Sequence, residues 1–349
     1  MKFNSIQYLR AIAILLVFIY HTYIVSEKYI NHENILNYFK YSGMIGVLLF
    51  FTISGFIMSY ILHIQEKNFY LKRFLRIYPV FLIAVILIIF LKVLIFGAIK
   101  EPYLPYAVTL LPLEIMKVSS VSGQTIIPSY PLGIEWSLIF ELFFYAIVGL
   151  FNNKLMRKFF LSFSIVWLGI IIYMYFKDHT VLATRVSYSE IFFSLYNIPF
   201  ILGVIVFAIY QKINYKTTFV LKWWGISILV VLFIVLSNEF IIFSSNHFLR
   251  IVVIAIMGAS LILVLILSTP QESKSNILLS VGNSSYGIYL LHLAILSIMF
   301  SVIHNILSLD ITVYIVLIVM TISFLISYTY GTFDLYVYNK LKRYITNRQ

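Results

Sequence analysis

Long apolar runs follow one another along almost the whole chain, and they constrain its fold more than any other feature. A helix needs about 20 mostly apolar residues to cross a hydrocarbon core about 30 Å thick. Only helices and closed barrels satisfy their backbone polar groups in lipid. The sequence therefore predicts an all-α integral membrane protein with about ten transmembrane helices. The predicted spans are residues 6–24, 41–62, 78–98, 134–151, 159–176, 194–210, 223–236, 248–268, 284–304 and 311–330.

The composition of the chain supports this class and excludes others. Of the 349 residues, 62% are hydrophobic and 11% are charged, whereas a soluble domain is about 45–50% apolar and about 25% charged. A water-soluble globular enzyme, a disordered protein and a nucleic-acid-binding protein are therefore excluded, despite the net charge of +12. The chain has no Cys, and its His residues lack the spacing of metal ligands, so neither a disulfide nor a metal site is predicted.

The distribution of Lys and Arg predicts the orientation in the membrane. With ten spans both termini lie on one side, and that side collects 17 of the 25 basic residues. Because basic loops stay in the cytoplasm, both termini are predicted to be cytoplasmic. We expect a single transmembrane domain over residues 1–340, a short basic cytoplasmic tail over residues 341–349, and a multi-pass location in the cell (inner or cytoplasmic) membrane.

The first predicted span carries two ionisable residues, which are costly in lipid and indicate a functional site. Arg10 and His21 are eleven residues apart, about three helical turns, so they share one face. His21 lies about 23 Å along a helix that begins at Ile6, which predicts a position in the extracytoplasmic half. A structural interpretation stays open, in which Arg10 snorkels to the inner surface and His21 makes a structural hydrogen bond.

Two further polar residues lie inside predicted spans. Glu141 is expected about 10 Å deep on the same outer side as His21. A buried carboxylate near an imidazole fixes its tautomer and stabilises the imidazolium, although a polar bridge between helices is an equally good interpretation. His292 lies about halfway along the ninth span, where a structural hydrogen bond and a role in the site are both open.

A pair of arginines precedes the third predicted span. Arg73 and Arg76 are three residues apart, so both can point the same way on one helical turn at the cytoplasmic mouth of the span. Composition favours a positive-inside anchor. The alternative is a clamp for an anionic cytoplasmic ligand, because guanidinium groups bind phosphate through two hydrogen bonds.

Five short motifs follow one another along nearly the whole chain. They are Leu9-Arg10-Ala11 with His21, Phe50-Phe51 with Ser54-Gly55-Phe56, Arg73 and Arg76 with Pro79, Trp136 with Glu141 and Tyr145, and Ser285-Tyr286-Gly287 with His292. In this order they resemble the motifs of membrane acyltransferase family 3, a family of multi-pass enzymes that modify polysaccharides and other acceptors. The second motif and the opening residues are most similar to the branch that O-acetylates exopolysaccharides.

The resemblance implies transfer of an acyl group, first of all acetyl, to a hydroxyl of an extracytoplasmic or lipid-linked polysaccharide. It implies acetyl-CoA or another acyl-CoA from the cytoplasm as donor substrate, no permanently bound cofactor, no nucleic-acid partner, and a bacterial membrane. It implies His21 as general base oriented by Glu141, with Arg73, Arg76 and Arg10 for the donor and Trp136, Ser54, Tyr145 and His292 for the acceptor.

One departure and one competing class complete the prediction. The last span of the family often closes on Glu-x-Pro, whereas this chain has Phe333-Asp334-Leu335. Buried charges on ten spans also suit a transporter or flippase of a polysaccharide or lipid-linked precursor. No inverted repeat is visible in the sequence, and labelled acyl incorporation distinguishes the enzyme from the transporter.

Overall fold

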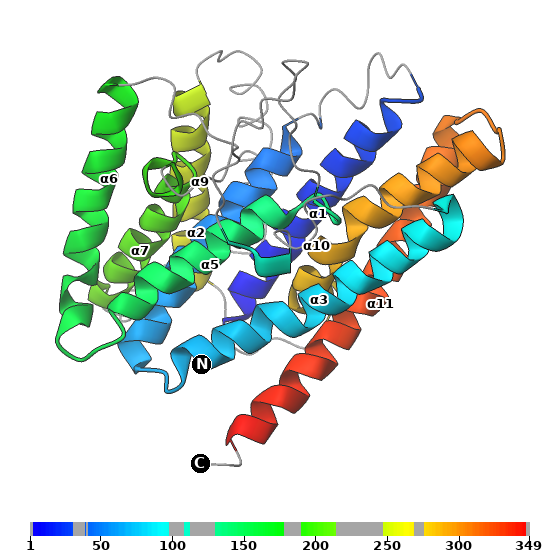
Figure 1. Ribbon diagram of the computed structural model, residues 1–349. Coiled ribbons are helices and arrows are strands. Elements are labelled where there is room, and N and C mark those ends of the chain that lie inside the picture. The colour runs from blue at the N-terminus through cyan, green and yellow to red at the C-terminus, as the bar shows by residue number, and fades with distance from the viewer. Residues whose placement is uncertain are drawn as a thin grey trace, which may run out of the picture.

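The computed structural model describes residues 3–30, 39, 41–97, 108–111, 130–177, 190–213, 247–268 and 276–346, which form helices and no strand (Figure 1). The predicted all-α class is therefore confirmed. The α-helices are α1 Asn4–Ser26, α2 Ser42–Ile64, α3 Phe69–Phe96, α5 Glu135–Leu150, α6 Phe160–Lys177, α7 Asn197–Lys212, α9 His247–Ser268, α10 Ile277–Ser301 and α11 Val313–Thr346. Short 3-10 segments cover Met156–Phe159 and Ile191–Phe193, and a π-helix covers Val302–Ile306.

Seven of the helical segments in the described ranges are long and apolar enough to cross a membrane. They are Asn4–Ser26, Ser42–Ile64, Phe69–Phe96, Met156–Lys177, His247–Leu267, Ile277–Ile306 and Val313–Tyr344. Helices α5 and α7 match two further predicted spans, but each has 16 residues. A helix of that length rises about 24 Å, which is less than the hydrocarbon core. The predicted span over residues 223–236 lies outside the described residues.

Two helices extend well beyond the apolar runs that predicted them. Helix α3 begins at Phe69 rather than at residue 78 and continues through Pro79. Arg73 and Arg76 therefore lie inside a helix rather than at its mouth, which corrects the expected start of the span. Helix α11 likewise continues to Thr346 and includes Asp334. Charged residues are tolerated inside these helices because other parts of the chain supply partners of opposite charge, as described below.

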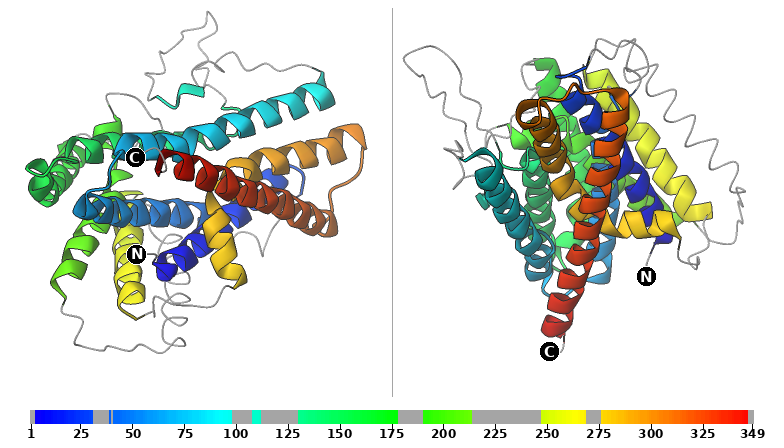
Figure 2. Two further views of the ribbon diagram at one scale, coloured as in Figure 1. Left: turned by 90° about the horizontal axis from the view of Figure 1, so that it is seen from below. Right: turned by 90° about the vertical axis from the view of Figure 1, so that its right-hand side faces the viewer.

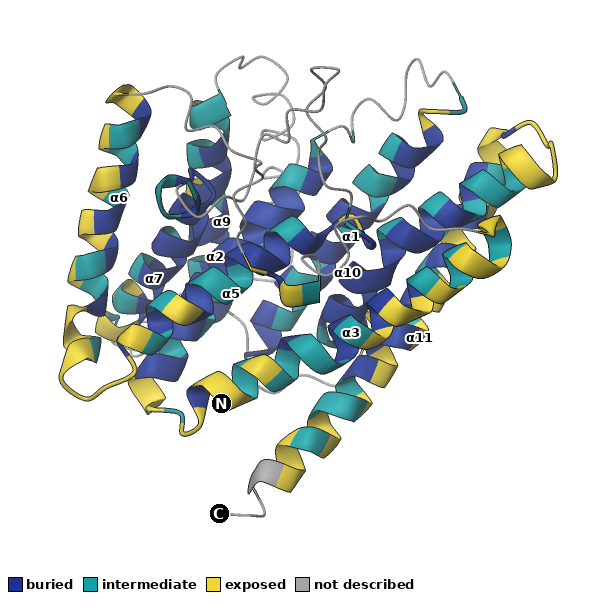
Figure 3. Ribbon diagram, in the orientation of Figure 1, coloured by how far each residue is buried: buried dark blue, intermediate teal, exposed yellow. Residues whose placement is uncertain are grey.

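Helices α1, α2 and α10 form the centre of the bundle. α1 packs against both α2 and α10, α10 packs against α3 and α11, and α2 packs against α5, α7 and α9. In the most apolar 18-residue stretch of α2, 78% of the residues are buried. The corresponding share is 28% in α3, in Met156–Lys177 and in α11. Figure 3 shows the exposed residues of α3, α6 and α11 on their outer faces. Apolar outer faces of this kind suit contact with lipid chains.

Close approach of two glycines fixes the crossing of α10 and α11. A side-chain carbon added at Gly287 would lie 2.5 Å from the backbone of Gly331, so neither position has room for a side chain. Small residues at such crossings let transmembrane helices pack backbone to backbone. This crossing brings the Asp334 region of α11 against the Ser285 region of α10.

The beginning of α1 and the end of α11 lie on the same side of the bundle, the lower side in Figure 1 and in the right-hand view of Figure 2. His21 lies five residues before the last residue of α1, toward the opposite side. The cytoplasmic location of the lower side stays a prediction.

Candidate active site

A cavity of about 260 Å³ lies between α1, α2, α3, α5, α10 and α11. Apolar side chains such as Phe50 and Met58 form part of its wall, and the polar part is unusually rich in arginine. We call this cavity the arginine chamber. Its polar lining consists of Gln7, Arg10, Ser54, Arg73, Arg76, Ser137, Glu141, Tyr145, Ser285, Tyr286, Tyr289 and Tyr338. Six of the nine predicted site residues therefore share one cavity: Arg10, Ser54, Arg73, Arg76, Glu141 and Tyr145.

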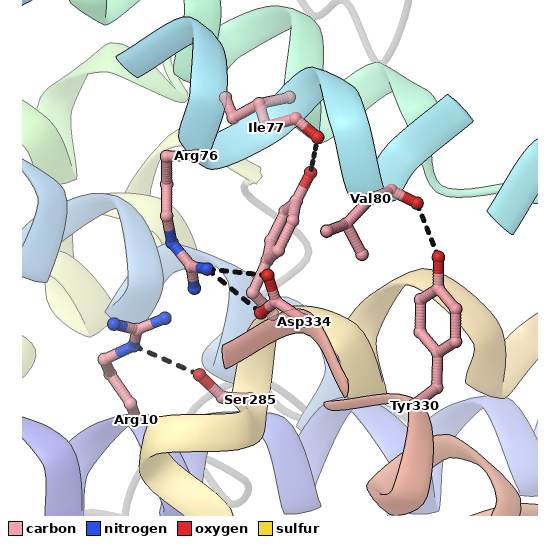
Figure 4. A network of polar contacts seen from close by, with 8 residues as sticks. Arg10, Arg76, Ile77, Val80, Ser285, Tyr330 and Asp334 are labelled. Atoms are coloured by element: carbon pink, nitrogen blue, oxygen red, sulfur yellow. Dashed lines mark hydrogen bonds and ion pairs between the residues drawn. The ribbon is translucent and has the colours of Figure 1, made fainter. Parts of the chain in front are cut away.

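Arg76 is held in the chamber by a buried ion pair with α11. Its Nη1 lies 2.9 and 3.0 Å from the two carboxylate oxygens of Asp334, whose side chain is fully buried (Figure 4). Its guanidinium carbon lies 4.8 Å from the ring centre of Tyr286 and 5.2 Å from that of Tyr338. Aromatic faces of this kind attract a guanidinium. Sequence reasoning did not assign a role to Asp334, although it is the single carboxylate in the sequence of α11.

Two tyrosine hydroxyls fasten α10 and α11 to the middle of α3. The hydroxyl of Tyr286 donates to the carbonyl of Ile77 at 3.1 Å, and the hydroxyl of Tyr330 donates to the carbonyl of Val80 at 2.5 Å (Figure 4). Pro79 has no N–H to donate and weakens the hydrogen bonding of its helix locally. The tyrosine contacts on both sides of Pro79 stabilise this part of α3 beside Arg76.

Arg73 is paired at the lower end of the chamber. Its Nη2 donates to the carboxylate of Glu66 at 2.9 Å, and Lys72 contacts the same carboxylate at 3.2 Å. The ring centre of Tyr145 lies 5.8 Å from the guanidinium carbon. The Nε atom of Arg73 is buried and has no hydrogen-bond partner among the described residues.

Arg10 differs from the other two arginines of the chamber. Its Nε donates to the hydroxyl of Ser285 at 3.1 Å, and it has no ion pair among the described residues. Figure 4 shows its guanidinium turned from α1 toward the space that Arg76 enters from α3. Arg10 is thus the arginine of the chamber whose charge is least compensated, which suits an anionic or strongly polar ligand.

Three polar atoms that line the chamber have no protein partner among the described residues. Gln7 Oε1, Ser54 Oγ and Arg73 Nε are buried and have no hydrogen-bond partner among the described residues. Buried polar atoms are almost always hydrogen-bonded to protein or to ordered water. These three atoms are therefore available to water or to a bound substrate.

Glu141 does not hydrogen-bond to His21 as the sequence suggested. Its Oε1 accepts a hydrogen bond from the hydroxyl of Tyr145 at 2.5 Å, one helical turn away. The expected depth assumed that the span enters from the outer surface. Helix α5 instead begins near the middle of the bundle (Figure 1), so Glu141 lies at the level of the chamber.

His21 has another histidine as its partner. Its Nδ1 lies 2.9 Å from Nε2 of His292, and the two ring centres are 4.9 Å apart. We call these two residues the histidine pair. His292 is fully buried, and its ring centre lies 5.6 Å from that of Tyr289, which lines the chamber. Tyr289 therefore contacts both the histidine pair and the arginine chamber.

The first turn of α5 supports Tyr289 and holds Trp136, the first residue of the fourth motif, outside the chamber. Glu135 is fully buried and accepts hydrogen bonds from the backbone N–H groups of Leu132 and Ile134 at 2.8 and 2.9 Å, so its carboxylate holds the turn that precedes the helix. The hydroxyls of Ser137 and Tyr289 are 2.6 Å apart. Trp136, predicted for the acceptor site, does not line the chamber.

Comparison with known proteins identifies the family of the chain. A family described as an acyltransferase domain, acyltransferase family 3, matches residues 3–330. The chain is 27% identical over 260 residues to the "Putative acetyltransferase ORF330" of Acidianus two-tailed virus, a similarity that covers 72% of each chain. No solved structure matches. Since the family match spans nearly the whole chain, including all nine predicted site residues, the protein is an acyltransferase that belongs to acyltransferase family 3.

Proposed function

We propose that the protein transfers an acyl group, most simply acetyl, from cytoplasmic acyl-CoA to a hydroxyl of an extracytoplasmic polysaccharide or lipid-linked glycan. The observation that carries this proposal is the arginine chamber, which lies next to the histidine pair. The similarity to a protein named as an acetyltransferase supports acetyl as the group. We propose exopolysaccharides as the acceptor class, because the sequence motifs resemble most those of the branch of the family that modifies exopolysaccharides.

The chamber suits the acyl-pantetheine end of the donor. Drug-sized ligands occupy pockets of about 300–1,000 Å³, so a cavity of about 260 Å³ is too small for a whole acyl-CoA molecule. The pantetheine arm would enter between the helices, with the phosphates at the lower end near Arg73 and the amide groups near Gln7 and Ser54. Arg10 is the charged group best placed for the polar carbonyl groups of the donor, because no carboxylate among the described residues occupies it.

His21 suits the acceptor side of the reaction. A sugar hydroxyl is a poor nucleophile until a base takes its proton, and neutral imidazole does this near pH 7. The hydroxyl oxygen attacks the thioester carbon, and the new ester bond forms as the carbon–sulfur bond breaks. His21 takes the hydroxyl proton and passes it to the CoA sulfur, so an acylated glycan and free CoA leave. The chain has no Cys that could carry a thioester intermediate, so we propose direct transfer.

The test uses the full chain in lipid nanodiscs with labelled acetyl-CoA and a purified bacterial exopolysaccharide as acceptor. Wild-type protein is expected to incorporate label, and His21→Ala is expected to reduce the rate by about 10²–10⁴-fold. His63→Ala is the matched control, because His63 is exposed at the end of α2 and pairs with Gln211. Equal rates for wild type and a folded His21→Ala protein would show that His21 is not the general base. If the wild-type protein incorporates no label, the proposed donor or acceptor is wrong.

A further inference from the structure

We propose that His292 is a positioning residue that fixes the tautomer of His21, so that Nε2 of His21 carries the lone pair that takes the acceptor proton. The inference rests on the proposed function for the role of His21 as base. The assignment of protons within the histidine pair does not, because it follows from hydrogen-bond geometry and from the burial of His292.

The first step concerns Nδ1 of His292. This nitrogen lies 2.7 Å from the carbonyl oxygen of Tyr289 and 3.2 Å from that of Ile288. A carbonyl oxygen can only accept a hydrogen bond. Nδ1 of His292 therefore carries a hydrogen and donates it to the backbone of its own helix.

The second step concerns the charge of His292. Its side chain is fully buried, and its hydrogen-bond partners among the described residues are the two carbonyl groups and His21, none of which carries a negative charge. A buried cation without a negatively charged partner is strongly disfavoured. The ring is therefore neutral, and because Nδ1 holds the hydrogen, Nε2 is the hydrogen-bond acceptor.

The third step infers from this which nitrogen of His21 carries the hydrogen. Nε2 of His292 lies 2.9 Å from Nδ1 of His21, so Nδ1 of His21 must be the donor. In a neutral ring the other nitrogen then has no hydrogen. Nε2 of His21 is left as the basic atom, and it lies on the side of the ring away from His292. When His21 accepts a proton, its Nδ1–H···Nε2 bond persists and becomes charge-assisted, which stabilises the imidazolium.

The packing of α1 against α10 explains why His292 can do this. The two helices meet at two levels, where Arg10 contacts Ser285 and where His21 contacts His292. Ser285 and His292 are seven residues apart, about two turns, so they lie on one face of α10. Both nitrogens of His292 are occupied and its side chain is buried, so it positions His21 without touching a substrate.

Three substitutions of His292 separate a positioning role from a purely structural one. His292→Gln can place an amide oxygen near the site of Nε2 and accept from His21, but it gives up the bond to Tyr289. His292→Asn is the matched control, because its shorter amide can donate to the Tyr289 carbonyl but does not reach His21. His292→Leu has neither group.

We expect kcat for acyl transfer to fall by about 10–100-fold in His292→Leu and His292→Asn, the range for partners that orient a functional imidazole. His292→Gln should recover most of this loss, with KM for acetyl-CoA unchanged in all three variants. Recovery by Asn and not by Gln would show that His292 only supports its own helix and would overturn the proposal. Equal activity in all variants would overturn it as well.

A measurement on the resting wild-type protein keeps the proposal testable if the variants fail to fold. In protein with ¹⁵N-labelled histidine, nuclear magnetic resonance distinguishes protonated from unprotonated ring nitrogens, and the missing signals of His21→Ala assign His21. We expect Nδ1 of His21 protonated and Nε2 unprotonated. The opposite tautomer would overturn the role of His292, whatever donor or acceptor the enzyme uses. The expected tautomer with no acetyl transfer from acetyl-CoA would count against the proposed function alone.

Discussion

The arginine chamber and the histidine pair are both built on α1 and α10, yet they accommodate buried polar groups in opposite ways. In the chamber, two of the three arginines are compensated by a carboxylate, since Arg76 pairs with Asp334 and Arg73 pairs with Glu66. In the histidine pair, the described hydrogen-bond partners are backbone carbonyl groups and the other imidazole, and none of them is a carboxylate. The first arrangement suits binding of a charged or polar donor, and the second suits exchange of a proton.

The largest effect that separates the two regions is expected from the ion pair of the chamber. Arg76→Ala leaves the Asp334 carboxylate buried and unpaired, so the free energy of unfolding should fall by about 3–5 kcal/mol. The double variant Arg76→Ala with Asp334→Ala removes both charges and should recover most of this loss. Denaturant titration of the protein in mixed micelles measures the difference.

Lys340→Ala is the control for loss of a basic residue on the outside. Lys340 is exposed on α11, so the free energy of unfolding should stay within about 0.5 kcal/mol of wild type. A double variant as unstable as Arg76→Ala would show that Arg76 stabilises the fold through its aromatic contacts with Tyr286 and Tyr338 rather than through the ion pair.

A smaller effect is expected from Arg10, on ligand binding more than on folding. Arg10→Ala removes the proposed charge-assisted contact to the donor, which should weaken acyl-CoA binding by about 1.5–3 kcal/mol, roughly ten- to a hundredfold in Kd. The unfolding free energy should change less than in Arg76→Ala, because only the Ser285 hydroxyl loses its partner. Titration of the nanodisc protein with a non-hydrolysable acyl-CoA analogue measures Kd.

Arg10→Lys sharpens this prediction. Lysine keeps the charge but cannot form a forked contact, so it should restore the Kd only in part. If Arg10→Ala binds the analogue as wild type does, the donor does not use the uncompensated charge of the chamber.

The sequence allowed the class of fold to be predicted and most charged residues of the chamber to be singled out, but not their common cavity or the pairing of their charges. Hydrophobic run length predicted the helices. Ionisable residues inside or beside those runs, together with motif resemblance, selected Arg10, Arg73, Arg76 and Glu141, which share one cavity. The partner of Arg76 is 258 residues away, and no local pattern connects Arg76 to Asp334. From the sequence, Arg76 was therefore predicted to bind phosphate, and its loss was expected to leave the fold intact. The ion pair with Asp334 predicts instead that loss of Arg76 lowers the stability of the fold.

The partner of His21 was missed for a different physical reason. A depth counted along a helix is correct only if the helix starts at the membrane surface, and α5 starts near the middle of the bundle. Glu141 was therefore expected at the level of His21, where His292 lies instead. The spacing of Ser285 and His292 by two turns was visible in the sequence, but it became informative only once α10 was known to lie against α1.

The smallest effect tests whether Glu141 belongs to the chamber or to the histidine pair. Tyr145→Phe removes the hydrogen bond to Glu141 and should cost about 0.5–1.5 kcal/mol in acyl-CoA binding, with Glu141→Gln in the same range. Combining Glu141→Gln with His21→Ala gives the decisive comparison. Residues in separate regions have additive effects to within about 0.3–0.5 kcal/mol, whereas residues that act as one unit do not. We therefore expect Glu141→Gln to lower the residual rate of His21→Ala by the same factor as it lowers the wild-type rate. A double variant no slower than His21→Ala would mean that Glu141 acts through His21 after all, by a rearrangement that brings α5 toward the histidine pair during turnover.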